Sequence, residues 1–283
     1  MTLFDVIVLG LVEGITEFLP ISSTGHMVLT TTLLHVPETD FVKTFIIVIQ
    51  LGAILAAAAL YWRRLLLDPR TLTITMLAFV PTGLIGFVVY RAIKSFLGNP
   101  AIVVASLLVG GALLVAIEWW LKGRDAPLDG PGGQLDDSGA LRGRSGGRAV
   151  RTIEVHQVSD ITYGQAIVIG TCQALSMIPG VSRSAATIMT GLLLGIDRKA
   201  IVEFSFILAI PTMAVASAYE IYKSHAAMSF EQVDQLAIGF GVAFVLALVA
   251  IKWLLRFVQT HSFNAFGVYR IIAAILFWLV VLR

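Results

Sequence analysis

The chain has 283 residues, of which 57% are hydrophobic and only 13% are charged, and its formal net charge is +2. Such a composition excludes a soluble globular protein, because too few polar side chains are available to cover the surface. It predicts an integral membrane protein. The single cysteine, Cys172, excludes an internal disulfide framework.

The first apolar region, at about residues 2–34, is broken in its middle by proline, glycine and clustered hydroxyl residues. A broken segment at membrane depth is tolerated only where it is buried in protein or lines a cavity. We therefore predict a re-entrant helical hairpin, in which the chain enters the membrane and returns to the same side. A second apolar region, at about 161–195, is broken in the same way and predicts a second hairpin.

Six apolar runs are long enough to cross about 30 Å of hydrocarbon as helices. They cover approximately residues 43–62, 72–93, 101–121, 201–222, 233–254 and 265–282. Together with the hairpins, these runs predict an all-α polytopic membrane protein with six transmembrane helices and two re-entrant helical hairpins.

The two halves of the chain resemble each other. A shift of 160 positions aligns Ser22 with Ser182 and Glu13 with Gln173, and each half has one hairpin followed by three spans. Because three is odd, the second half must enter the membrane in the opposite orientation, which is an inverted-topology repeat. The predicted units are repeat 1 at 1–122, a cytoplasmic linker at 123–160 and repeat 2 at 161–283.

The lysines and arginines are distributed unequally across this topology. Five lie on the side to which the first hairpin opens, and thirteen lie on the other side. By the positive-inside rule, the side with thirteen is cytoplasmic. We expect the first hairpin to open outward, the second to open inward and both termini to lie outside. The Gly-, Asp- and Arg-rich stretch 123–151 is expected to be a disordered part of the linker.

Two glutamates in the first hairpin form the start of a candidate site. If residues 4–18 are helical, Glu13 and Glu17 lie one turn apart on one face. Two such carboxylates repel each other in an apolar setting, so either one holds a proton or a cation lies between them. Mg²⁺ or Ca²⁺, held by the two carboxylates and by substrate phosphate oxygens, would satisfy this arrangement. A structural ion pair with Arg183 is the competing interpretation.

A run of hydroxyl residues follows Pro20: Ser22, Ser23 and Thr24, with His26 shortly after. Hydroxyls at a helix start are good N-caps, and the unpaired amides there form an anion site. Capping needs only one of the three hydroxyls. Ser23 and His26 are three residues apart, so on a helix they could act as a nucleophile and its proton partner. The alternative for His26 is a hydrogen-bonded packing role.

The second hairpin has a similar polar run. It consists of Ser182, Arg183, Ser184 and Thr187. Arginine is suited to bidentate contact with phosphate oxygens. Because inverted repeats place their broken helices face to face near the membrane midplane, Arg183 and Ser23 are expected to meet. Gln50, in the first span, either faces the same pocket or serves helix packing.

Three classes of function are compatible with paired half-helices. Secondary transporters bind substrates between such half-helices, and a transporter of a lipid headgroup is therefore the main alternative. A transporter has less use for a Ser/His pair beside two carboxylates, whereas an enzyme that breaks a phosphoanhydride uses all these groups. We therefore favour an enzyme. A structural membrane scaffold is the third class.

The segments EGITEFLPISSTGH, at 13–26, and PGVSRS, at 179–184, resemble the motifs of the undecaprenyl-diphosphate phosphatase family, also known as bacitracin-resistance proteins. The resemblance covers nearly the whole chain. It implies a multi-pass enzyme of the bacterial inner membrane that hydrolyses undecaprenyl diphosphate to undecaprenyl phosphate. This reaction recycles the lipid carrier for peptidoglycan and other cell-wall polymers. The resemblance also implies a divalent cation as cofactor (Mg²⁺ or Ca²⁺), an active site facing the periplasm and a possible homodimer. We expect no nucleic-acid partner.

By position, the resemblance implies catalytic roles for Glu17, Ser23, His26 and Arg183, and a metal site at Glu13 and Glu17. We favour Ser23 as nucleophile, with Glu17 or His26 handling the proton. Attack by His26, or by water activated through Glu17, is the alternative. The expected substrate phosphate-binding residues are Ser22, Thr24, Gln50, Ser182, Arg183, Ser184 and Thr187. The chain departs from the family at Ala185, where glycine is common, so the turn after Arg183 is expected to differ slightly.

Overall fold

The computed structural model describes residues 1–94, 99–124, 155–224 and 232–281. Most of the predicted linker at 123–160, including the part of 123–151 beyond residue 124, lies outside these residues. The described part of the chain is helical, with one isolated β-bridge between Val155 and Ile196. The expectation of an all-α protein is confirmed.

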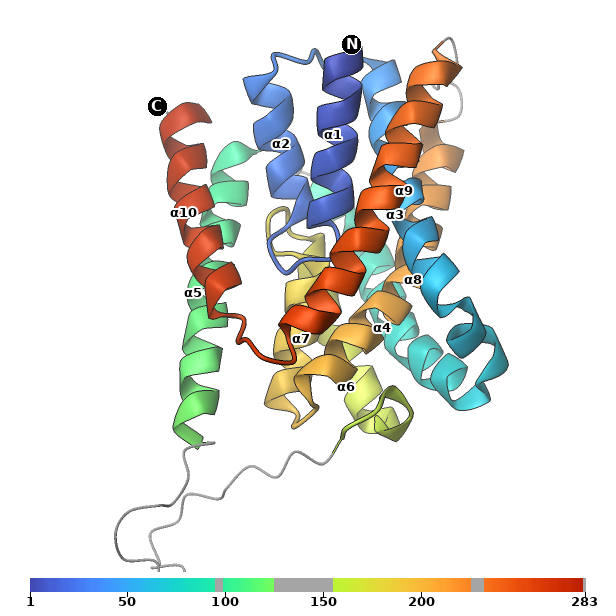
Figure 1. Cartoon of the computed structure of the whole chain (residues 1–283), viewed down its shortest axis with the longest axis vertical. Coiled ribbons are helices and arrows are strands. Elements are labelled where there is room, and N and C mark those ends of the chain that lie inside the picture. Colours follow the sequence, from blue (N-terminus) through green and yellow to red (C-terminus); the bar gives the residue numbers. More distant parts are fainter. Residues whose placement is uncertain (95–98, 125–154, 225–231, 282–283) are drawn as a thin grey trace, which may run out of the picture.

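The described residues form ten α-helices and two short 3₁₀ helices, joined by loops (Figure 1). They are α1 (Leu3–Thr16), α2 (Ser23–Leu33), α3 (Asp40–Leu67), α4 (Pro69–Lys94), α5 (Pro100–Arg124), η1 (Val158–Asp160), α6 (Tyr163–Gln173), η2 (Ala174–Met177), α7 (Arg183–Leu193), α8 (Arg198–Ser224), α9 (Val233–Phe257) and α10 (Asn264–Val281).

Five helices in the described part are long and apolar enough to cross a membrane: α3, α4, α5, α8 and α9. Many of their exposed side chains are large and apolar; Val109 on α5, for example, is 56% exposed. A surface of this kind suits contact with lipid rather than with water. The sixth predicted span, at 265–282, corresponds to α10, in which the apolar segment Asn264–Val280 is shorter than a spanning helix. The count of six spans therefore stays a prediction.

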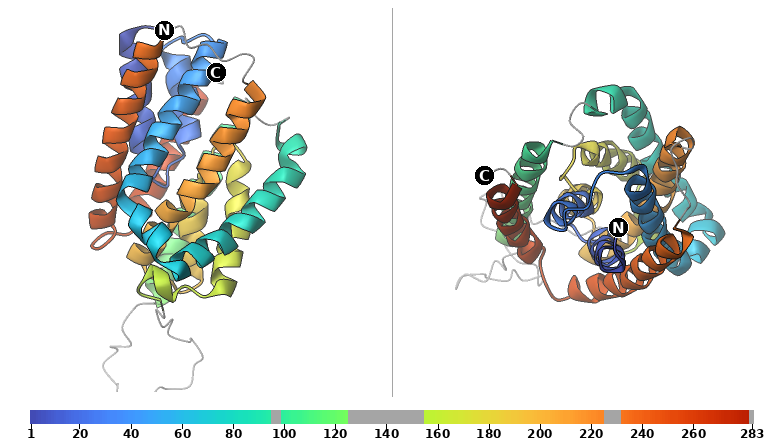
Figure 2. Two further views of the ribbon diagram at one scale, coloured as in Figure 1. Left: turned by 90° about the vertical axis from the view of Figure 1, so that its right-hand side faces the viewer. Right: turned by 90° about the horizontal axis from the view of Figure 1, so that it is seen from above.

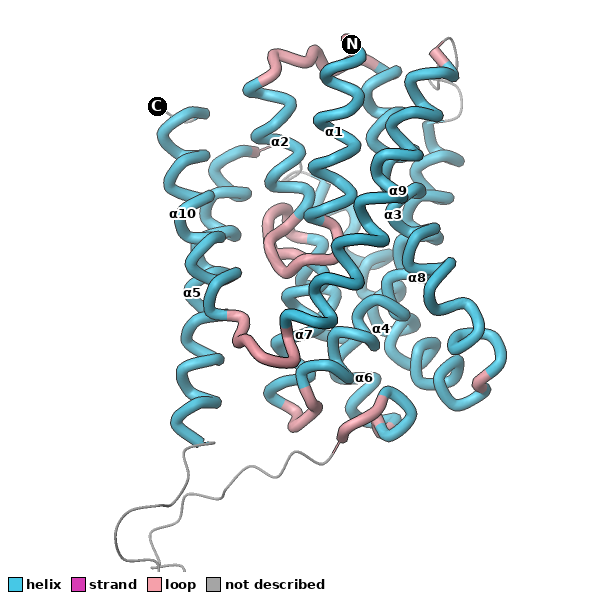
Figure 3. The backbone as a smooth tube through the Cα atoms, in the orientation of Figure 1, coloured by secondary structure: helices cyan, strands magenta, loops and turns pink. Residues whose placement is uncertain are grey.

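The two broken regions form helical hairpins in opposite halves of the bundle. Helices α1 and α2 lie in the upper half of Figure 1, and α6 and α7 lie in the lower half. The loops that join the two arms of each hairpin meet at mid-height, inside the bundle (Figure 3). Seen from above, α1 and α2 lie near the centre, with longer helices around them (Figure 2). The two chain breaks therefore lie near each other in the middle of the bundle.

The helices of both hairpins begin with matching N-terminal caps. Thr2 with Asp5, and Thr162 with Gln165, form capping boxes at α1 and α6. After the breaks, Ser22 and Ser182 cap α2 and α7, and both have a positive φ, of 72° and 76°. Such a φ is uncommon for a residue with a side chain. The 160-residue alignment of the sequence therefore pairs positions that share an unusual local geometry.

The hairpins pack against long helices in a matching way. Helix α1 packs on α9, and α6 packs on α4. Gly10 of α1 lies so close to α9 that an added Cβ would be 2.9 Å from the carbonyl oxygen of Gly239. Gly170 of α6, the aligned residue, would meet the carbonyl of Ala78 on α4 in the same way. Small residues allow backbones to approach this closely in a membrane bundle.

Candidate active site

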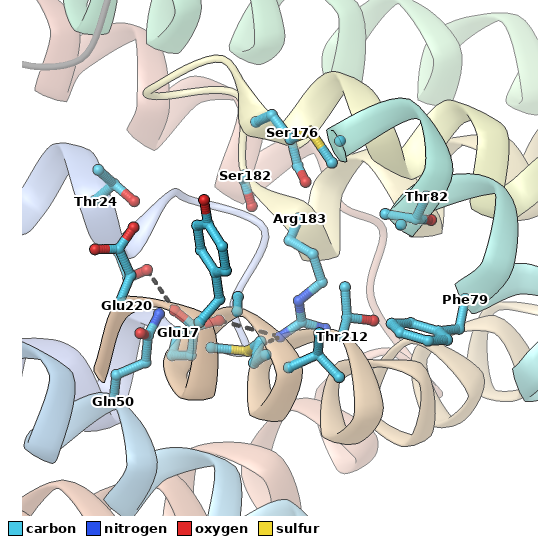
Figure 4. Close-up of a pocket in the computed structure, with 18 of the residues that line it drawn as sticks. Glu17, Thr24, Gln50, Phe79, Thr82, Ser176, Ser182, Arg183, Thr212 and Glu220 are labelled. Atoms are coloured by element: carbon cyan, nitrogen blue, oxygen red, sulfur yellow. Dashed lines mark hydrogen bonds and ion pairs between the residues drawn. The ribbon is translucent and has the colours of Figure 1, made fainter. Parts of the chain in front are cut away.

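A cavity of about 820 Å³ lies between the two hairpin loops and helices α3, α4 and α8 (Figure 4). Its lining combines polar groups from both hairpins with an apolar wall. The residues named from the sequence that line it are Glu17, Ser22, Ser23, Thr24, Gln50, Ser182 and Arg183. The two motifs, far apart in the sequence, therefore border one space.

Glu17 joins the two motifs. It follows the last residue of α1 and is 8% exposed. One carboxylate oxygen accepts a hydrogen bond from the Ser23 hydroxyl at 2.5 Å, and the other accepts one from Nη2 of Arg183 at 3.2 Å. The structure thus brings Ser23 and Arg183 to the same carboxylate. Hydrogen bonds to an ionised acceptor are the strong ones, so this arrangement fixes both side chains.

Several contacts hold the Arg183 guanidinium in place. Nη1 donates to the carbonyl oxygen of Ser205 on α8 at 2.8 Å, and the guanidinium lies 5.5 Å from the centre of the Phe18 ring. Phe18 in turn packs edge-on against Phe206. The Nε atom is buried without a hydrogen-bond partner among the described residues. Arg183 lines the cavity and extends toward Glu17 (Figure 4), so its positive charge borders the space in which an anionic ligand would lie.

The starts of α2 and α7 both border the cavity. The Ser22 hydroxyl accepts a hydrogen bond from the amide of Gly25, and that of Ser182 accepts one from the amide of Ala185 at 3.2 Å. The remaining first-turn amides of a helix have no partner inside it, and the helix dipole adds partial positive charge there. Two such ends at one cavity favour an anion such as phosphate. Ala185 lies within α7 and has no positive φ, so the turn does not require glycine at this position.

Two residues expected to bind phosphate lie outside the cavity lining. The Ser184 hydroxyl donates to the carbonyl oxygen of Leu19 at 2.8 Å, which links the two hairpin loops. The Thr187 hydroxyl lies 3.2 Å from Oε1 of Gln173 and 3.0 Å from the carbonyl oxygen of Arg183. Both side chains are fully buried. The structure gives them contacts between parts of the protein, and it does not place them against a ligand.

The Ser23 and His26 side chains do not form the pair that their spacing allowed. Nδ1 of His26 lies 2.7 Å from the carbonyl oxygen of Ser22, and Nε2 lies 2.7 Å from the hydroxyl of Tyr269 on α10. The histidine ring also stacks on the Tyr269 ring. Both ring nitrogens are therefore engaged away from Ser23, whose hydroxyl points to Glu17. His26 does not line the cavity.

Glu13 lies one turn before Glu17 on α1 and is 3% exposed. Its Oε1 atom has no hydrogen-bond partner among the described residues. Gln173, the aligned residue of α6, is by contrast bonded to Thr82, Thr212 and Thr187. A buried, unpartnered carboxylate oxygen is costly. It fits a cation, and Mg²⁺ often takes one or two carboxylates and completes its coordination with substrate oxygens and water.

Sequence reasoning missed several groups at the cavity. The polar ones are Thr82, Ser176, Thr212 and Glu220, which come from α4, η2 and α8 (Figure 4). Thr82, Ser176 and Thr212 are single polar residues among apolar neighbours, and Glu220 lies near the polar end of an apolar run, so no motif or spacing marked them. The lining also includes apolar side chains from the same elements, among them Phe79, Phe87, Val88, Met177 and Val215. A cavity lined by both kinds of side chain suits an amphipathic ligand that has an anionic head and a hydrocarbon chain.

Comparison with known proteins gives consistent results over the whole chain. A sequence model of the family described as "Bacitracin resistance protein BacA" matches residues 6–276. An undecaprenyl-diphosphatase of Sulfurihydrogenibium sp. is 44% identical, over 99% of both chains. An undecaprenyl-diphosphatase of Wolinella succinogenes is 41% identical over 98% of this chain and 97% of the relative. That of Aquifex aeolicus is 41% identical over 98% of each.

Proposed function

The chain belongs to the bacitracin resistance protein BacA family, and from this premise we propose that it hydrolyses undecaprenyl diphosphate to undecaprenyl phosphate and phosphate. It is an integral-membrane phosphatase that recycles the lipid carrier for cell-wall synthesis. The observation that carries this assignment is the Ser23–Glu17–Arg183 arrangement at a cavity with an apolar wall. The transporter considered from the sequence has no support, because the relatives are named as diphosphatases.

We propose the following arrangement in the membrane. The two hairpins are re-entrant, α10 is the sixth span, and repeats 1–122 and 161–283 have inverted topology around the linker at 123–160. The positive φ shared by Ser22 and Ser182 supports this arrangement, as do the matching packing pairs α1 with α9 and α6 with α4.

The proposed location is the bacterial inner membrane, with the cavity open toward the periplasm. The Lys and Arg distribution supports the orientation, because it assigns the end at which α1 begins to the outside. Helix α8 runs toward that end (Figure 2), and the cavity-lining Glu220 lies near its last turn. A homodimer, which family resemblance implies, stays a prediction.

The geometry supports Ser23 as the nucleophile. Its hydroxyl oxygen would attack the terminal phosphorus, while Glu17 accepts the hydroxyl proton through the bond that already joins them. The bridging P–O bond then breaks, and undecaprenyl phosphate leaves with the bonding electrons. Arg183 and the first-turn amides of α2 and α7 would hold the phosphate oxygens. The engagement of both His26 ring nitrogens makes His26 a poorer candidate for the attack.

A second step returns the enzyme to its starting state. Water attacks the phosphorus of the phosphoserine, and the bond between phosphorus and the Ser23 oxygen breaks. Glu17 returns its proton to the departing Ser23 oxygen, and the two water protons leave on dihydrogen phosphate. The net reaction consumes one water molecule and releases one phosphate for each lipid diphosphate.

The donor groups fit a divalent cation held by Glu13 and Glu17. Glu13 offers a buried carboxylate oxygen that has no hydrogen-bond partner in the described part of the chain, and Glu17 lies one turn away. Among the described residues, no group of three or more His, Cys, Asp or Glu side chains is suited to a metal, so substrate oxygens would have to complete the coordination. Bound there, the cation would neutralise negative charge on the phosphate oxygens.

Phosphate release tests the proposal. Purified protein is incubated with undecaprenyl diphosphate and Mg²⁺ or Ca²⁺, and the released phosphate is measured for the wild type and for Ser23→Ala and Arg183→Ala. Thr32→Ala is a matched control, because the Thr32 hydroxyl lies on α2 outside the cavity and, in the part of the chain that the structure describes, donates to a carbonyl of its own helix. We expect turnover by the wild type and the control and loss of turnover in the other two. A wild type that releases no phosphate would contradict the assignment.

A further inference from the structure

Arg270 is a buried cation for which the mechanism has no use so far. It lies on α10 and has 0% exposure. Helix α10 packs against α5, and a Cβ added at Gly110 of α5 would overlap the Arg270 guanidinium. The neighbouring Gly111 would place a Cβ 3.0 Å from that of Arg270. The two glycines of α5 therefore leave the space that this side chain occupies.

The guanidinium of Arg270 is surrounded by backbone carbonyl oxygens. They belong to Leu107 (from Nε, 3.5 Å), Ser106 and Gly180 (from Nη2, 3.2 and 2.9 Å), and Pro20 and Val181 (from Nη1, 3.3 and 3.0 Å). An arginine has five N–H donors, so each donor has an acceptor. None of the four ion pairs among the described residues includes Arg270.

These carbonyls belong to both hairpin loops. Pro20 lies two residues before the N-cap of α2, and Gly180 and Val181 lie directly before the N-cap of α7. Gly180 has a φ of +92°, which favours glycine, so the chain turns sharply at the point that Arg270 holds. One rigid, planar group thus fixes both loops to each other and to α5. The loops lie side by side at mid-height of the bundle (Figure 3).

The two loops that Arg270 holds lie next to the residues of the candidate active site. Glu17 and Ser23 flank the first loop, and Arg183 follows the second, so their alignment depends on how the loops are held. Burying the Arg270 cation among neutral carbonyl groups costs free energy, and a neutral amide side chain could donate to such carbonyls at a lower cost. The positive charge of Arg270 lies beside the starts of α2 and α7, where it adds to the electric field that favours an anion.

We propose that Arg270 is a positioning residue: it fixes the two hairpin loops so that Ser23, Glu17 and Arg183 are aligned, and its charge favours binding of the anionic headgroup. This inference rests on the proposed phosphatase function. A misplacement of about 1 Å can reduce turnover by about 100-fold, so loosening the loops should be visible in kcat.

Two substitutions separate the positioning role of Arg270 from the effect of its charge. Arg270→Lys keeps the charge and loses the planar fork, whereas Arg270→Gln loses both. Arg256→Gln, at an exposed arginine near the end of α9, is the control. The measurements are kcat and KM for phosphate release, the melting temperature, and amide hydrogen exchange in residues 18–22 and 178–182.

We expect Arg270→Lys to lower kcat about tenfold or more and to accelerate exchange in both loops, with little change in KM. Arg270→Gln should in addition raise KM severalfold, because the charge is lost. Wild-type kcat and wild-type loop exchange in Arg270→Lys would overturn the proposal. So would faster exchange throughout the chain with an unchanged kcat of the folded protein, since that indicates a purely structural role.

A second pair of variants keeps the proposal testable if the Arg270 variants do not fold. Gly110→Ala places a methyl group against the guanidinium, whereas Gly241→Ala adds the same group to another helix, where no described atom beyond the adjacent residues and helix backbone lies within 4 Å of it. We expect faster loop exchange and lower kcat in the first variant only, and equal behaviour of the two would overturn the proposal. If the wild type releases no phosphate, the proposed function fails, and loop exchange alone decides whether Arg270 fixes the loops.

Discussion

Replacing Glu17 by glutamine changes a single charge at the point where Ser23 and Arg183 meet. Glutamine has almost the same size, but it has one acceptor oxygen and one amide group that only donates. Arg183 only donates, so it requires the oxygen. The amide must then face Ser23 and donate to its hydroxyl, which reverses the 2.5 Å bond seen in the wild type. Ser23 would be left without a proton acceptor.

The expected magnitudes follow from this geometry. Loss of a general base lowers turnover by about 10² to 10⁴, which corresponds to about 3–5 kcal/mol in the activation free energy. Removing one partner of a buried ion pair costs about 3–5 kcal/mol of stability. We expect a smaller loss of stability here, about 1–3 kcal/mol, because the glutamine oxygen still accepts a hydrogen bond from Arg183. The Arg183 side chain is also 10% exposed and keeps its hydrogen bond to the carbonyl of Ser205. Glu17→Gln should therefore fold and fail to turn over.

The assay measures phosphate release from undecaprenyl diphosphate at saturating substrate, together with thermal unfolding of the same preparation. Glu38→Gln, at an exposed glutamate, is the control for loss of a negative charge. A folded Glu17→Gln protein that keeps more than about a tenth of the wild-type kcat would refute the role of Glu17 as base.

One trapping experiment and two further substitutions test other parts of the structure. A phosphorylated intermediate trapped by rapid acid quench should map to Ser23, and recovery of a phosphohistidine at His26 would contradict the serine mechanism. Glu13→Gln should raise the melting temperature in chelator, because it neutralises a buried carboxylate whose Oε1 has no partner within the described residues. It should also raise the cation concentration needed for half-maximal turnover, and unchanged cation dependence would exclude Glu13 as a ligand. Glu118→Gln should cost about 2–4 kcal/mol of stability and leave the kcat of the folded protein unchanged, because the buried Glu118 carboxylate bonds Arg198 and the amide of Phe263 away from the cavity; chemical denaturation and phosphate release measure the two effects.

The helices were largely predictable from the sequence because run length and chain breaks carry the information. Long apolar runs marked α3, α4, α5, α8 and α9, and the clusters of Pro, Gly and hydroxyl residues marked both hairpin loops. The side of each helix that faces the cavity was not predictable. In a membrane bundle the outer and inner faces are both apolar, so periodicity does not separate them. Thr212 and Glu220 were missed for this reason.

The convergence of Glu17, Ser23 and Arg183 followed from the repeat, which placed the two breaks opposite each other. The partners of individual side chains did not follow from it. His26 bonds Tyr269, which is 243 positions away in the sequence, and Ser184 bonds the opposite loop. Such contacts depend on how helices pack at long range, and local spacing contains no information on them.

The ion pair between Glu17 and Arg183 has a consequence for synthesis of the chain. The two residues are 166 positions apart, so the ribosome needs about 8–33 s to reach Arg183 after Glu17, at about 5–20 residues per second. During this interval the first hairpin carries a carboxylate whose cationic partner does not yet exist. We expect the first hairpin to stay near water or within the insertion machinery until α7 arrives, because an unpaired charge is costly in lipid. Assembly of the membrane domain and assembly of the active site would then be completed by the same late event.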